Sequence, residues 1–177
     1  MRWAGLALLV VMPIHVVMRP EHAWLLLSAC DVAVIVCAIG AIAGRLDVVA
    51  IAGLFALAVG LPSYAIGLAT TNPINPTSLV VHVVPAIMGI VAIKRQGLPR
   101  RAALIAWCAY VLVFVAGYLF PPHELNINMA SKVWPPLARV FPTTLAFHAG
   151  LLALTAGLLL AGEQIAVRAR RVPPARS

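Results

Sequence analysis

Long apolar stretches, separated by short polar or proline-containing segments, recur along almost the whole chain. They lack the alternation of apolar and polar residues that a membrane β-strand requires, and this favours helices. A helix needs about 20 apolar residues to cross a bilayer, within a range of roughly 17–25. The pattern therefore predicts an all-α bundle of six transmembrane helices, near Trp3–Met18, Ala23–Ala43, Val48–Ala69, Ser78–Ile93, Ala102–Leu119 and Thr143–Ala166.

The ends of these segments divide the chain into two parts. We expect a transmembrane domain over residues 1–166 and a basic cytoplasmic tail over residues 167–177. The first and fourth helices are the shortest, and we expect them to lie steeply or to extend into the interface. The first 18 residues begin like a signal peptide but lack a small-x-small cleavage site, so we expect them to remain as the first helix.

The basic residues predict the orientation of the bundle. With six helices and a cytoplasmic N-terminus, ten of the 13 Lys and Arg residues fall on the inner side, including the KRQGLPRR and VRARR clusters. The outer side holds Arg19, Lys132 and Arg139. Cytoplasmic loops carry an excess of Lys and Arg, so both ends are predicted to lie in the cytoplasm of a bacterium, with the chain in its inner membrane.

Composition excludes several classes of protein. The chain is 63% hydrophobic and 10% charged, which is too apolar for a soluble domain. Its net charge of +8 lies in short clusters between apolar runs, so we do not expect nucleic-acid binding. Three cysteines without a C-x-x-C motif predict neither a disulfide framework nor a structural metal.

The candidate chemistry lies at one depth. His15, Asp31, His82 and His148 fall within predicted spans, and a rise of about 1.5 Å per residue places them about 5–12 Å from the outer ends. Ionisable groups within a bilayer usually face a bundle interior, a partner or a water-filled cavity. One shared polar site in the outer half is therefore predicted, and separate structural pairing of these groups remains the alternative.

Further residues extend this candidate site. Thr144 shares a helix face with His148, and Cys30 precedes Asp31 and is a candidate nucleophile. Asn126 and Asn128 lie in the longest outer loop, where they would either bind substrate or cap a short helix. The outer loops would roof the site with Asn72, Asn75, His123 and Glu124 as well.

The order of these motifs resembles that of a known family. WLLLSACD, which contains Cys30 and Asp31, is followed by His82 and then by the Asn126-x-Asn128 loop, and together they resemble the YwaF-like family of bacterial integral membrane proteins. Eukaryotic relatives of that family include a membrane phospholipid acyltransferase. The resemblance implies a lipid substrate and acyl transfer by Cys30 or His82. The chain departs from the family's Asn-Tyr and Lys-Pro signature after the loop.

A second resemblance, to the androgen-induced-gene-like lipid hydrolases, would pair Thr144 or Thr77 with His82. The leading hypothesis is thus a membrane-embedded enzyme acting on a lipid or isoprenoid. In it Asp31 orients a histidine, His82 or His148 is the general base, and Asn126, Asn128, His15 and Thr144 contact the substrate. A proton-coupled carrier, a haem-binding protein with His82 and His148 as ligands, and an accessory subunit remain alternatives. The residues specify no cofactor, and we do not expect a metal site.

Overall fold

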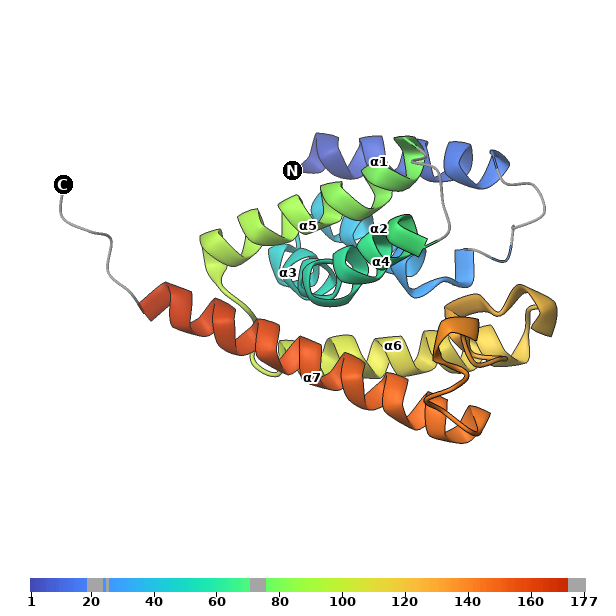
Figure 1. Cartoon of the computed structure of the whole chain (residues 1–177). Coiled ribbons are helices and arrows are strands. Elements are labelled where there is room, and N and C mark those ends of the chain that lie inside the picture. Colours follow the sequence, from blue (N-terminus) through green and yellow to red (C-terminus); the bar gives the residue numbers. More distant parts are fainter. Residues whose placement is uncertain (19–23, 25, 71–75, 172–177) are drawn as a thin grey trace.

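The computed structural model describes residues 1–18, 24, 26–70 and 76–171. Helices make up 84% of the structure and the described residues contain no strand, which confirms the predicted all-α class. The described residues form six long helical rods (Figure 1). They are α1 (Arg2–Val17), α2 (Ala29–Ile42), a continuous rod of α3 (Leu46–Phe55), η2 (Ala56–Gly60) and α4 (Leu61–Thr70), then α5 (Pro76–Gln96), α6 (Ala102–Leu119) and α7 (Thr144–Arg171).

Four of these rods are long and apolar enough to cross a membrane. They are the α3–η2–α4 rod, α5, α6 and α7, with lengths from 18 to 27 residues. Helices α1 and α2 are apolar but shorter, with 16 and 14 residues. The fourth predicted span, expected to be short, is a helix of 21 residues, whereas the second is the shortest of the six.

The start of α2 explains its short length. Ser28 has an extended backbone with ψ of 142°, and its hydroxyl accepts a hydrogen bond from the Asp31 N–H at 3.1 Å. This is the geometry of a helix N-cap, so the helix begins at Ala29 rather than at Ala23, where the hydrophobic run begins. Residues 24, 26 and 27 form a 3₁₀ turn, and residues 19–23 and 25 lie outside the described part of the chain.

Two glycines end helices on the side of the bundle opposite the long loop. Gly44 follows α2 with φ of +73°, and Gly97 follows α5 with φ of +87°. A left-handed residue just after a helix satisfies its last carbonyl groups, and glycine adopts that conformation without steric cost. Pro76 begins α5, at a position where a helix does not need the missing N–H.

The α3–η2–α4 rod lies at the centre of the bundle. It packs on α2 and α5 on one side and on α6 and α7 on the other, while α1 covers α2 and α5 (Figure 1). Gly53 and Gly89 meet where α3 crosses α5, and a Cβ on either would collide with the backbone of the other. Small residues at such crossings let membrane helices approach closely.

The loop between α6 and α7 is ordered by three 3₁₀ turns, η3 (His123–Leu125), η4 (Ile127–Met129) and η5 (Pro135–Leu137). It lies at the end of the bundle opposite the start of α1 and the end of α7 (Figure 1). Of the predicted basic tail, residues 167–171 continue α7, and residues 172–177 lie outside the described part of the chain.

Candidate functional site

Cys30 on α2 and His82 on α5 line the same small cavity inside the bundle. Ala56 and Gly60 of η2 and the buried Pro85 of α5 form other parts of its wall. The cavity has a volume of about 10 Å³, which is room for one water molecule. The structure therefore places a thiol and an imidazole in the wall of one small cavity.

The turn η2, which forms one wall of this cavity, is π-helical. The N–H of Leu61 donates to the carbonyl of Ala56, five residues back. Pro62 follows and has no N–H to donate, so the regular α-helical ladder is interrupted here in any case. A Cβ added at Gly60 would lie 4.0 Å from the Cys30 sulfur. Single π-helical turns often occur at functional sites.

Ser63, just after this turn, adds a hydroxyl to the site. It donates to the carbonyls of Val59 at 2.8 Å and Gly60 at 3.0 Å. The same hydroxyl lies beside the Cys30 thiol. The Ser63 hydroxyl thus lies near Cys30, and it also satisfies two carbonyl groups of the π-helical turn, those of Val59 and Gly60.

The orientation of His82 is fixed from two sides. Its Nδ1 lies 2.7 Å from the Ser78 carbonyl oxygen, which can only accept, so Nδ1 carries the hydrogen. In the neutral imidazole Nε2 is then the basic nitrogen. The Tyr64 ring stacks on the imidazole with centroids 4.2 Å apart and planes at 11°. The Tyr64 hydroxyl oxygen is buried and has no hydrogen-bond partner among the described residues.

Asp31 and His15 are both buried, with 3% and 4% of their surface exposed. Asp31 lies in the first turn of α2, next to Cys30 in the sequence. His15 lies at the end of α1 that faces the start of α5, and its Nδ1 is 2.9 Å from the Thr77 hydroxyl. His15 therefore ties α1 to α5.

His148 lies elsewhere, between α6 and α7. Its ring meets Phe114 edge-on, with centroids 5.1 Å apart and planes at 85°, and it also contacts Phe147. The His148 Nε2 atom is buried, and no residue within the described ranges forms a hydrogen bond with it. Thr144, one turn earlier on α7, is exposed. The structure therefore places His148 in an aromatic cluster and does not bring it to the wall that Cys30 and His82 share.

Asn128 joins the long loop to two helices. Its Oδ1 accepts from the Ala29 N–H at 2.7 Å, and its Nδ2 donates to the carbonyls of Leu27 at 2.8 Å and Val113 at 3.3 Å. Gly117 makes room for it, because a Cβ there would lie 2.9 Å from Nδ2. The amide thus holds the start of α2 against α6.

The Asn126 amide also binds backbone groups, in this case within the loop itself. Its Oδ1 accepts from the N–H groups of Ser131 at 3.0 Å and Lys132 at 2.8 Å, and its Nδ2 donates to the Lys132 carbonyl at 3.1 Å. Both asparagines have positive φ, of 47° and 56°. Their polar atoms bind backbone, so we assign them to the loop's architecture and do not include them in the site proposed below.

The predicted roof is described only in part. Asn72 and Asn75 lie outside the described residues. The His123 Nε2 lies 3.2 Å from the Tyr118 carbonyl, and its ring stacks on that of Tyr118. Within the described ranges, no group of three or more His, Cys, Asp or Glu side chains is placed to hold a metal ion.

Sequence reasoning missed Ser63 and Tyr64 as members of the site. The available signal was Pro62, because a proline inside an apolar span marks a local break in the helix. A polar side chain next to such a break can bond to backbone carbonyl groups of the interrupted turn, as Ser63 does with Val59 and Gly60.

Comparison of the chain with models of known families, with curated proteins and with solved structures finds no match. The fold and the site together define a class. In the part of the chain that the structure describes, the protein is all-helical, with four helices that could cross a membrane and with a cysteine and a histidine on one small cavity.

Proposed function

We propose that the chain is a membrane-embedded enzyme that transfers or hydrolyses an acyl group on a lipid or isoprenoid. The main support for this proposal is that Cys30 and His82 line one cavity beside a π-helical turn. A thiol nucleophile with a nearby imidazole base is a common arrangement in acyl-transfer enzymes. The resemblance of WLLLSACD and His82 to the YwaF-like family supports the same chemistry.

The proposed setting is the inner membrane of a bacterium, with all six rods crossing it and both ends in the cytoplasm. Support comes from the ten-to-three distribution of Lys and Arg residues between the two sides. In this orientation the N-terminal end of α2 and the first half of α5 lie in the outer leaflet. The substrate would therefore be a lipid of the outer leaflet.

The proposed chemistry uses the two nitrogens of His82 differently. Nδ1–H stays bound to the Ser78 carbonyl, and Nε2 takes the thiol proton while the Cys30 sulfur attacks the ester carbonyl of the lipid. The ester C–O bond breaks, and the proton passes to the leaving alkoxide. Water or a second lipid hydroxyl then attacks the thioester, His82 takes its proton, and this proton returns to the departing thiolate.

The test uses the full chain purified in detergent and a phospholipid or polyprenyl ester with a radioactive acyl group. We expect a label on Cys30 that hydroxylamine releases, and the Cys30→Ser variant should lack it. His82→Ala should lower the rate by about 10²–10⁴-fold, as for loss of a general base. Cys108→Ala is the matched control, because that thiol is exposed on α6. Wild-type rates in folded Cys30→Ser and His82→Ala variants would refute the proposal.

A proton-coupled carrier is the second candidate, because the cavity has room for about one water and Asp31 is buried next to Cys30. Such a chain of groups suits a proton relay. Proteoliposomes under a pH gradient separate the two functions. An enzyme leaves the gradient unchanged while its lipid is consumed, whereas a carrier dissipates the gradient only in the presence of its solute.

A further inference from the structure

A second, larger hollow lies on the other half of the bundle, between α5 and α7. It has a volume of about 550 Å³ and is open to the exterior along its length. The wall is formed by the side of α3 and η2, with Leu54, Leu57 and Ala58, and by facing residues of α5 and α7. Its size is that of a ligand site rather than of a packing defect. We refer to it as the α5–α7 groove.

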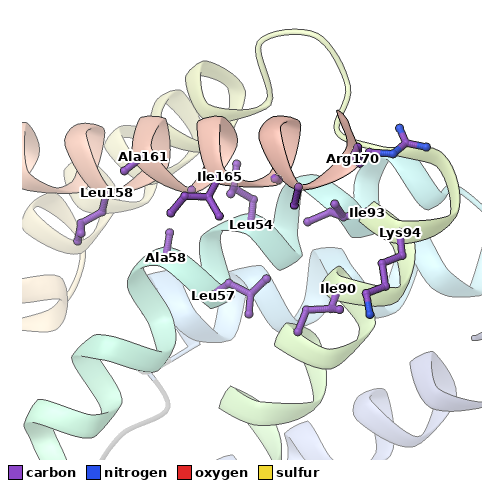
Figure 2. Close-up of a pocket in the computed structure, with 13 residues that line it drawn as sticks. Leu54, Leu57, Ala58, Ile90, Ile93, Lys94, Leu158, Ala161, Ile165 and Arg170 are labelled. Carbon is purple, nitrogen blue, oxygen red and sulfur yellow. The ribbon is translucent and has the colours of Figure 1, made fainter. Parts of the chain in front are cut away.

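The groove is apolar along its length and basic at one end. Figure 2 shows Leu158 and Ala161 toward one end and Lys94 and Arg170 at the other. Lys94 lies in the last turn of α5, and Arg170 lies in the last turn of α7. Both cations are exposed, and neither is ion-paired to a described residue. An apolar channel that ends in two unpaired cations matches an acyl chain joined to an anionic head.

Gly97 accounts for the position of the guanidinium. Arg170 lies directly on this residue, and a Cβ at Gly97 would collide with its Nη1 atom. Gly97 has φ of +87° and ends α5 just beyond Lys94. The same glycine therefore ends α5 and leaves room for the guanidinium of α7, and Lys94 and Arg170 lie on opposite walls at one end of the groove (Figure 2).

We infer that the α5–α7 groove binds an anionic phospholipid, with its head group at the end of the groove where Lys94 and Arg170 lie and one acyl chain along Leu57, Ala58 and Ile93. Charge complementarity selects this occupant, since basic pockets between membrane helices on the cytoplasmic side bind anionic head groups. Guanidinium and ammonium groups both suit a phosphate. The groove and the Cys30–His82 cavity share no lining residue, although η2 contributes to the wall of each, and occupancy of the groove does not depend on the proposed chemistry.

Native mass spectrometry of the full chain in detergent tests this inference. The probes are phosphatidylglycerol and phosphatidylcholine with identical acyl chains. We expect phosphatidylglycerol to bind more tightly, and Lys94→Gln/Arg170→Gln to weaken its binding roughly tenfold or more. The control is Arg95→Gln/Arg168→Gln, which removes the same charge from exposed positions on the same two helices outside the groove. Equal binding of the two lipids, or equal loss in both double variants, would overturn the inference.

A second variant tests the apolar part. Ala161→Phe fills the groove and should reduce the binding of phosphatidylglycerol, whereas Ala149→Phe adds the same ring to an exposed position of α7 outside the groove. Cys30→Ser/His82→Ala should bind the lipid as the wild type does, so failure of the proposed enzyme and failure of this site are separate results. If Ala161→Phe instead dissociates a dimer and leaves lipid binding unchanged, the groove is an interface between copies and the inference is wrong.

Discussion

The ring of Tyr64 stacks on the imidazole of His82 at a centroid distance of 4.2 Å, with the planes 11° apart. Tyr64 belongs to α4, which has no fully buried residue, and His82 belongs to the well-packed α5. The stacked pair therefore holds the helix that follows the π-helical turn against the rest of the bundle. It also covers one face of the histidine that we propose as the general base.

Two substitutions at Tyr64 should distinguish the contribution of its ring to stability from that of its hydroxyl. Tyr64→Phe keeps the stack and removes a buried oxygen that forms no hydrogen bond with any described residue, so the free energy of unfolding should rise by about 1 kcal/mol. Tyr64→Leu loses the stack and should lower it by about 0.5–1.5 kcal/mol. Thermal unfolding in detergent measures both variants. A loss of stability in Tyr64→Phe would mean that the hydroxyl has a partner.

Asn128 should matter more for stability than its loop position suggests. Asn128→Ala leaves the Ala29 N–H and the Leu27 carbonyl without this partner, and it places alanine at φ of +56°. Each unsatisfied buried group costs about 1–3 kcal/mol, so we expect a loss of about 3 kcal/mol in the free energy of unfolding. Thr144→Ala, at an exposed position, is the control and should change it by less than about 0.5 kcal/mol. A small effect at Asn128 would remove its assigned role.

The positions of the helices could be read from hydrophobic runs, because a bilayer requires a minimum apolar length of each crossing segment. The hydrophobic runs did not predict where α2 begins. Its apolar run extends back to Ala23, but Ser28 and the amide of Asn128, 99 positions beyond Ala29, fix the first turn. A hydrogen bond over that sequence distance leaves no local pattern, so the boundary depends on tertiary contacts.

The sequence predicted the depth of each candidate residue in the bundle, but it did not predict which side chains face the same cavity. Cys30 and His82 were singled out by sequence and line one cavity, since residues at equal depth on packed helices can meet. His148 lies at a similar depth, but rotation of α7 turns it toward Phe114. Depth follows from counting residues along a helix, whereas rotation follows from packing. The asparagines show the same limit, because a polar side chain in a loop binds backbone as readily as substrate.

The crossing of α3 and α5 gives a test of helix packing with an internal control. Gly89→Ala would place a methyl group against the Gly53 backbone, within 3.0 Å of its Cα and carbonyl carbon. Separating the two helices to relieve that contact should cost about 1–3 kcal/mol. Gly157→Ala meets nothing within 4 Å on α7, so it should be neutral or slightly stabilising through helix propensity. Equal unfolding temperatures for the two variants would show that α3 and α5 do not cross at these glycines.

The number of membrane crossings rests on α1 and α2, because both are shorter than a typical span. If all six rods cross, position 24 lies outside and position 45 lies inside, although only 20 residues separate them. We therefore expect Trp24→Cys, in a chain without its native cysteines, to react with an impermeant maleimide in spheroplasts, and Arg45→Cys to react only after lysis. Lys132→Cys is the positive control for the outer side. If positions 24 and 45 label from the same side, α2 does not cross, and the proposed six-span arrangement is wrong. Because Cys30 shares a cavity with His82 on α5 and Ala29 is bound by the Asn128 amide, that result would also contradict the packing of α2 described above.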